Sequence, residues 1–174
     1  MTVGIYYATT TGKTEDVADR LHNFIHSAKS PIDVSDVDDL SEFENLDGII
    51  CGLPTWNTGA DEERSGTSWD SILQDIGELN LSGKKVAIFG LGDSSTYTEN
   101  YCDAMEELHR YFAKSGAEMV GYVNKSSYTF DESKSLIGES FCGLPLDEDS
   151  ESDLTDSRLE SWATQLKTEI PSLA

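Results

Sequence analysis

Short apolar runs alternate along this chain with stretches whose apolar residues recur at helical spacing, and this alternation constrains the fold most. Strands are expected at 3–7, 32–34, 48–53, 85–90 and 119–123. The first helical stripe carries Val17, Leu21, Phe24 and Ile25. Strands that alternate with helices form a parallel sheet with right-handed crossovers. We therefore expect one α/β domain spanning residues 1–174.

Further helices are expected near 39–45, over 67–76, around Leu108 and Phe112, and around Leu159 and Trp162. We expect Trp69 and Trp162 to lie in the core. The polar, serine-rich stretch 125–140 breaks the alternation, and a short apolar run follows it at 140–144. This pattern predicts an insertion that interrupts the fifth strand.

The net charge of −21 narrows the choice of partners. Such a field repels the phosphates of nucleic acids and of anionic lipids, so neither a nucleic acid nor a membrane is an expected partner. It favours a basic protein partner, or it serves solubility only, and composition leaves both interpretations open.

Cysteine usage and the start of the chain bear on the compartment. Cys51, Cys102 and Cys142 are widely spaced and include no CxxC pair, so we expect neither a disulfide framework nor a thiolate metal site. Cys51 lies in an apolar run and is expected in the core. Met1 leads directly into the first strand, which suggests a cytosolic chain or a mature form without its targeting segment.

The loop Thr9-Thr10-Thr11-Gly12-Lys13-Thr14 joins the first strand to the first helix. A helix N-terminus offers unpaired N–H groups and the positive end of the dipole, and the hydroxyls suit a phosphate. The alternative is that Thr9 or Thr11 only caps the helix. A Walker A loop is excluded because Tyr7 occupies the position of its first glycine.

Two aromatic residues lie in polar loops that follow the third and fourth strands. Trp56 lies within 54–59 and Tyr97 within 90–100. The second loop is not a dinucleotide fingerprint, because Ser95 replaces its third glycine. Core packing and contact with a flat ligand are both open for Trp56. With the phosphate loop, the two rings describe a site for a phosphorylated flat ring, a shape that flavin mononucleotide (FMN) has.

These motifs together resemble the flavodoxin family, specifically its long-chain members from cyanobacteria and algae. The resemblance rests on the phosphate loop, on Pro54-Thr55-Trp56-Asn57, on Gly92-Asp93 with Tyr97 and Asn100, and on 143–149, and it covers essentially the whole chain. It implies a doubly wound three-layer sandwich whose five-stranded parallel sheet has the order 2-1-3-4-5. The loop 60–68 is longer than in typical cyanobacterial members and resembles red-algal ones.

The resemblance implies non-covalently bound FMN. The phosphate would be held by Thr9, Thr10, Thr11, Gly12, Lys13 and Thr14, and the isoalloxazine would lie between Trp56 and Tyr97. The remaining implied site residues are Pro54, Thr55, Asn57, Thr58, Gly59, Gly90, Leu91, Gly92, Asp93, Asn100, Tyr101 and Asp147. The peptide between Asn57 and Thr58 is implied to turn when the flavin is reduced, with Gly59 giving it freedom.

The implied function is that of a low-potential one-electron carrier, not an enzyme, and no catalytic residue is predicted. Resemblance to photosynthetic members implies a monomer that takes electrons from photosystem I to ferredoxin–NADP reductase in place of ferredoxin when iron is scarce. Its compartment would be the cytosol or an algal plastid stroma. Asp61, Glu62 and Glu63 are expected to form an acidic rim, with Asp93 and Glu99, that steers these partners. An FMN-dependent quinone reductase is the alternative.

Two other patterns are weaker. His22 and His26 have the i, i+4 spacing of a metal site but lack a third ligand, so we expect surface histidines. The acidic run that begins at Asp147 lacks the glycine of a calcium loop, because Ser152 stands there. We expect no metal, and we expect Asp153 or Thr155 to cap the last helix.

Overall fold

The computed structural model describes residues 2–174 and contains one parallel sheet with five strand positions. The order is β2 (Ile32–Asp33), β1 (Val3–Tyr7), β3 (Gly48–Leu53) and β4 (Lys85–Leu91), and the fifth position is shared by β5 (Glu118–Val120) and β9 (Leu144–Leu146). Every pair in this sheet is parallel. The predicted order 2-1-3-4-5 is confirmed.

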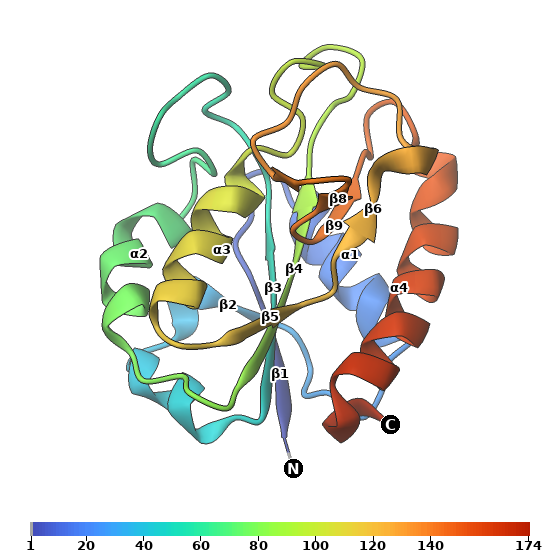
Figure 1. The fold of residues 1–174 in the computed structure, drawn as a ribbon. Coiled ribbons are helices and arrows are strands. Elements are labelled where there is room, and N and C mark those ends of the chain that lie inside the picture. Colours follow the sequence, from blue (N-terminus) through green and yellow to red (C-terminus); the bar gives the residue numbers. More distant parts are fainter. Residues whose placement is uncertain (1) are drawn as a thin grey trace.

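Helices cover both faces of the sheet (Figure 1). One side carries α1 (Lys13–His22) and α4 (Thr155–Glu169), and the other carries α2 (Trp69–Glu78) and α3 (Ala104–Lys114). Successive residues of each strand point to opposite faces of the sheet and pack into two hydrophobic cores, one under each pair of helices. Ile5, Ile50 and Phe89 pack toward α1 and α4, whereas Ile49, Cys51 and Ile88 pack toward α2 and α3. Strands buried on both faces explain the continuous apolar runs.

The predicted core aromatics and several boundaries can be compared directly. Trp69 and Trp162 are buried, as expected, with 0% and 1% exposure. The second strand ends at Asp33 because the Asp33 carboxylate accepts the N–H of Ser35 at 2.9 Å and begins the 3-10 turn η1 (Val34–Asp36). The helix expected at 39–45 is a 3-10 helix, η2 (Leu40–Asn45).

The first helix is shorter than its apolar stripe. It ends at His22, and Ile25 is buried from a following turn in which its N–H donates to the carbonyl of His22 at 3.2 Å. The helix expected at 67–76 is α2, which begins at Trp69 and ends at Glu78. Beyond the end of α1, Ile25 therefore extends the buried apolar stripe of this helix from the turn that follows it.

The insertion in the fifth strand is confirmed. β5 ends at Val120 and Gly121 turns the chain with φ +80°. A small antiparallel sheet follows in the order β6 (Val123–Asn124), β8 (Ser140–Phe141), β7 (Leu136–Ile137), with the turn η3 (Lys125–Ser127) between β6 and β7. β9 then returns to β4. The remaining 3-10 turns are η4 (Ser152–Leu154) and η5 (Pro171–Leu173).

Candidate functional site

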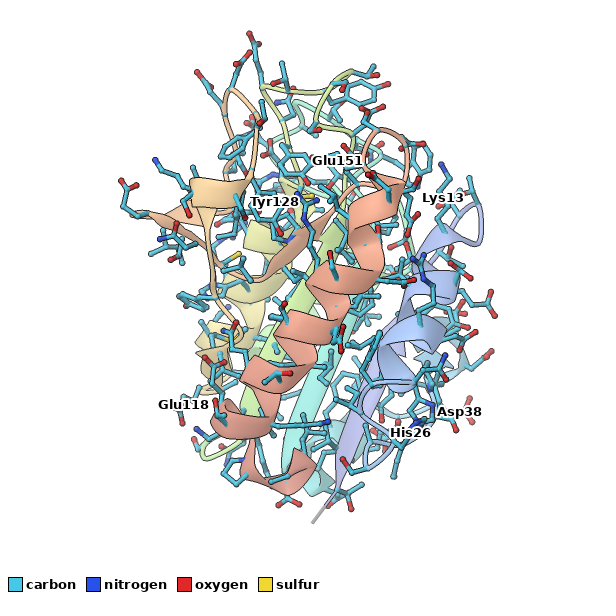
Figure 2. The ribbon with its side chains drawn as sticks, turned by 90° about the vertical axis from the view of Figure 1, so that its right-hand side faces the viewer. Lys13, His26, Asp38, Glu118, Tyr128 and Glu151 are labelled. Carbon is cyan, nitrogen blue, oxygen red and sulfur yellow. The ribbon has the colours of Figure 1, made fainter. Side chains whose placement is uncertain are left out.

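Loops that leave the carboxyl ends of β1, β3, β4 and β9 meet at one end of the molecule, the upper end in Figure 1. In the view of Figure 2, Lys13 at the start of α1 lies at this end, and His26, Asp38 and Glu118 lie toward the other. The loops border an open hollow at this edge of the sheet. It is lined by Thr9, Thr10, Thr11, Lys13, Thr14, Pro54, Thr55, Trp56, Leu91, Gly92, Asp93, Tyr97, Glu148 and Asp149.

The N-terminus of α1 borders the hollow. Gly12 is its N-cap residue with φ +90°, and no side chain within residues 2–174 caps the helix. The Thr9 hydroxyl instead accepts the N–H of Gly12 at 2.9 Å and folds the loop. The alternative that Thr9 or Thr11 only caps α1 is therefore excluded, and the first N–H groups of the helix are left for an anion.

Two aromatic rings also line the hollow. Trp56 is 49% exposed and Tyr97 is 47% exposed, although most large apolar side chains are buried. Core packing, which the sequence left open for Trp56, is thereby excluded. A flat ring that contacts both side chains would remove much of this apolar surface from water.

The loop after β3 flanks the hollow. The N–H of Ala60 donates to the carbonyl of Asn57 at 3.2 Å, and Gly59 holds this turn with φ +80°. Residues with a Cβ disfavour a positive φ, so glycine suits this position. Asn57, Thr58 and Gly59 are beside the lining residues rather than among them. Thr55 lines the hollow and also contacts the start of α3, where its hydroxyl accepts the N–H of Ala104 at 3.2 Å.

The lining is acidic. Burial raises the pKa of Asp93, but the N–H groups of Thr96 and Ser95 and the Ser150 hydroxyl outweigh this and leave that pKa below its ordinary value. The hydrogen bond to Asp149 raises the pKa of Lys13 and keeps the ammonium charged. Lys13 is already paired with Asp149. The negatively charged end of a ligand would therefore be bound mainly by the backbone N–H groups at the start of α1.

Besides the turn residues Asn57, Thr58 and Gly59, five predicted site residues lie outside the lining: Tyr101, Gly90, Asn100, Asp147 and Gly12. Tyr101 is fully buried, and its ring packs against Phe130 and Phe141 at centroid distances of 5.7 and 6.1 Å. Gly90 leaves room for Met105, whose Cγ lies 2.4 Å from where a Cβ would stand. The Asn100 amide points to Asp103 at 3.5 Å. These three residues pack or support the loops.

Asp147 is the fourth. Its carboxylate is fully buried and accepts the N–H and hydroxyl of Ser94 at 2.9 and 2.7 Å and the N–H groups of Asp149 and Ser150 at 3.0 and 2.7 Å. It therefore joins the loop after β4 to the loop after β9. Gly12 also lies just outside the hollow, in an adjoining surface depression with Lys13.

Sequence reasoning did not assign Glu148 or Asp149 to the lining of the hollow. Both follow β9, so a signal existed in the acidic stretch after 144–146. The predicted caps of α4 are wrong: no side chain in the described part of the chain caps it, and the Thr155 hydroxyl is buried without a partner. The rim residues Asp61, Glu62 and Glu63 are exposed, as a docking rim requires.

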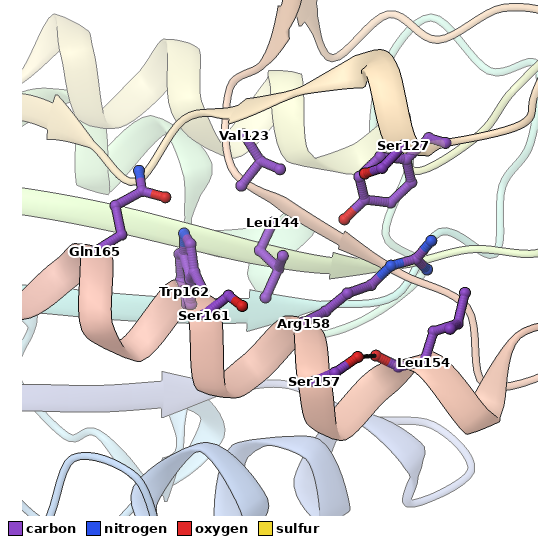
Figure 3. Close-up of a pocket in the computed structure, with 10 residues that line it drawn as sticks. Val123, Ser127, Leu144, Leu154, Ser157, Arg158, Ser161, Trp162 and Gln165 are labelled. Carbon is purple, nitrogen blue, oxygen red and sulfur yellow. Dashed lines mark hydrogen bonds between the residues drawn. The ribbon is translucent and has the colours of Figure 1, made fainter.

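A second hollow lies between α4 and the insertion (Figure 3). Val123, Leu144 and Trp162 form its apolar floor, and Arg158 stacks on the Tyr128 ring at 4.2 Å from its centroid. Leu154 and Ser157 at the start of α4 also line it, but it lacks the threonine-rich loop that lines the first hollow. In residues 2–174 no cluster of His, Cys, Asp or Glu is arranged to hold a metal ion, and no helix is long and apolar enough to cross a bilayer.

Comparison with known proteins agrees with this arrangement. The flavodoxin family model matches residues 5–162. A flavodoxin of Nostoc is 39% identical over 171 residues, covering 97% of this chain and 96% of the relative, and that of Synechococcus elongatus is 37% identical, covering 97% of each. The structure of Fusobacterium nucleatum flavodoxin bound to flavin mononucleotide superposes with a TM-score of 0.86 at 29% identity, covering 97% and 98%. The chain belongs to the flavodoxin family.

Proposed function

We propose that this chain is an electron carrier that holds FMN in the hollow at the carboxyl end of its sheet. Flavodoxins are electron-transfer proteins rather than enzymes, and the chain belongs to that family. One observation carries the assignment to this hollow: an uncapped helix N-terminus and two half-exposed rings line the same hollow.

The residues present fit FMN. Thr9, Thr10, Thr11 and Thr14 surround the start of α1 and offer hydroxyls for the phosphate, beside backbone N–H groups. Trp56 and Tyr97 would hold the ring by its faces, and Leu91 and Gly92 would lie against it from the loop after β4. Asn57, Thr58 and Gly59 would border its outer edge.

Bound FMN supplies reversible transfer of one electron at a time. The chain's contribution is electrostatic. Asp93, Glu148 and Asp149 line the hollow, and a further negative charge among these carboxylates is disfavoured. We therefore propose a low reduction potential, set by this acidic lining and by the aromatic walls that keep water from the ring.

We further propose that the partners are basic redox proteins: photosystem I as donor and ferredoxin–NADP reductase as acceptor, in place of ferredoxin when iron is scarce. Asp61, Glu62 and Glu63 are exposed on the loop beside Trp56 and would steer such partners toward the flavin end. The chain would act as a monomer. Its three free, buried cysteines suit a reducing compartment, for which we propose the cytosol or a plastid stroma.

The first test is cofactor binding. We expect the purified protein to be yellow, and we expect its apoprotein to quench the fluorescence of added FMN with one-to-one stoichiometry. Apoprotein that neither quenches FMN fluorescence nor releases heat when titrated with FMN would refute the assignment.

The second test is partner steering. We expect electron transfer to ferredoxin–NADP reductase to slow as salt rises from about 0.01 M to about 1 M, because the Debye length falls from about 30 Å to about 3 Å. Neutralising the rim (Asp61→Asn, Glu62→Gln, Glu63→Gln) should lower the low-salt rate. The control Asp36→Asn, Asp38→Asn, Glu118→Gln removes equal charge, and two of its sites lie toward the opposite end (Figure 2). Equal rates for the two triple variants would refute steering by this rim.

A further inference from the structure

The loop beside Trp56 contains a buried arginine. Arg64 is only 7% exposed, and its guanidinium donates to the carbonyls of Ala60 and Asp61 at 3.2 and 3.0 Å, within the same loop. It also reaches the first turns of α3, where it donates to the Asp103 carbonyl at 3.2 Å and to the Glu106 carboxylate at 2.7 Å. An arginine that is desolvated to this degree fixes the loop to the helix through charge-assisted hydrogen bonds.

Glu107 holds the same loop from the helix side. Its side chain is buried, at 3% exposure, and its two carboxylate oxygens accept the N–H groups of Glu63 and Arg64 at 2.8 and 3.0 Å. Glu63 has φ +55°, a region that an L-residue with a long side chain seldom adopts. The buried carboxylate thus supports an unfavourable backbone conformation. We call Arg64 and Glu107 the loop clamp.

The loop segment 63–66, which Arg64 and Glu107 hold to α3, is hydrogen-bonded to Trp56 and Asn57. The N–H of Trp56 donates to the Ser65 carbonyl at 3.4 Å, and the N–H of Asn57 donates to the Arg64 carbonyl at 3.1 Å. The Asn57 amide donates to the Glu63 carbonyl at 2.6 Å. A Cβ on Gly66 would stand 2.9 Å from the Cβ of Trp56, so the loop segment 63–66 also packs closely against this residue. Residues 63–66 are therefore the support on which Trp56 and Asn57 rest.

We propose that Arg64 and Glu107 are positioning residues that fix Trp56 and the turn 57–60 against the flavin ring. The inference rests on the proposed binding of FMN in this hollow. The clamp works through the ring side only, because none of its bonds reaches the phosphate loop 9–14. Its loss should therefore weaken binding of the ring and leave the grip on the phosphate unchanged.

Two variants separate positioning from charge. Arg64→Gln makes the site more negative by one charge, and Glu107→Gln makes it less negative by one, but both loosen the same loop. Titration of each apoprotein with riboflavin and with FMN, followed by fluorescence quenching, measures ring affinity with and without the phosphate. We expect both variants to bind both ligands about tenfold or more weakly, the range for losing a hydrogen bond to a charged group. The factor should be the same for the two ligands.

Arg110→Gln is the matched control. Arg110 also pairs with Glu106, at 3.2 Å, but its side chain is 49% exposed. This variant should stay within about twofold of the parent, as surface substitutions do. The proposal fails if Arg64→Gln and Glu107→Gln shift affinity in opposite directions, or if both match Arg110→Gln.

Hydrogen exchange of the unmutated apoprotein decides the matter even if a variant does not fold. We expect the amides of Asn57, Glu63 and Arg64 to exchange slowly, and rates typical of an open loop would refute the clamp. If the parent protein bound no FMN, the proposed function would fail, and slow exchange at these amides would still report an intact clamp.

Discussion

Replacing Trp56 by alanine tests the aromatic part of the proposed site. Trp56 is 49% exposed, so of a side-chain area of roughly 250 Å² about 120 Å² faces solvent in the absence of a ligand. A ring stacked on one face would cover about half of that, roughly 60 Å². At about 25 cal/mol per Å² this contributes about 1.5 kcal/mol.

Stacking geometry adds to the burial term. Aromatic pairs contribute about 0.5–1.5 kcal/mol beyond area, so Trp56→Ala should cost about 2–3 kcal/mol of binding. Because about 1.4 kcal/mol is a tenfold change in affinity, FMN should bind roughly 30- to 140-fold more weakly. The loss should be similar for riboflavin, since Trp56 belongs to the loop after β3 and not to the phosphate loop 9–14.

The assay is quenching of flavin fluorescence on titration of the apoprotein. Trp56→Phe should recover part of the loss because a smaller aromatic face remains. Ile137→Ala is the control, since Ile137 is equally exposed, at 50%, but lies in the insertion. If Trp56→Ala bound FMN as tightly as Ile137→Ala, the assignment of Trp56 to a ring contact would be wrong.

Three further predictions concern the protein without its cofactor. Tyr101→Phe should leave the apoprotein equally stable or about 1 kcal/mol more stable in urea denaturation, because the buried Tyr101 hydroxyl has no hydrogen-bond partner among residues 2–174. Gly12→Ala should lower the free energy of unfolding by about 1–2 kcal/mol, because φ is +90° there, although no atom lies within 4 Å of the added Cβ. Burial lowers the pKa of His109 in the folded state. The unfolded chain therefore binds the proton more readily, and stability should fall as pH drops through the ordinary histidine range; His109→Gln should lose that part of the pH dependence.

Each of these has a contradicting result. A destabilised Tyr101→Phe would mean that the hydroxyl has a partner such as a bound water. Gly12→Ala as stable as the parent would mean that the loop relaxes to negative φ at no cost. For His109, whose ring nitrogen lies 2.7 Å from the Tyr122 hydroxyl, identical pH profiles for parent and His109→Gln would exclude the burial argument.

Much of the architecture could be predicted because it depends on local pattern. β1 and β3 begin and end where the apolar runs do, since both faces of these strands are buried and every residue must be apolar. For Trp56, its place among turn residues left core packing and exposure both open, and the structure decides for exposure. The strand order came from the family resemblance, and spacing alone did not supply it.

The side chains whose surroundings the sequence did not predict are held by contacts between segments that are distant in the chain. Tyr101 resembles a loop aromatic in sequence, but the insertion folds back and covers it with Phe130 and Phe141. Asp147 is turned inward by Ser94, a residue of another loop. Arg64 lies in an exposed-looking acidic stretch, and only the position of α3 reveals that its guanidinium is buried. None of these orientations is encoded in neighbouring residues.

The divided last strand has a consequence for how length can vary in such a chain. Val120 is the register partner of Ala87, and Leu144 is that of Phe89, so a single residue opposite Ile88 would restore an unbroken edge. Gly143 already lies against Ile88: an added Cβ would meet its carbonyl oxygen. Residues 121–142 are therefore an insertion within an edge strand. Its removal would keep the register of β5 and β9 against β4. It would also expose the ring of Tyr101 and remove the Gly121 carbonyl that accepts the indole N–H of Trp162.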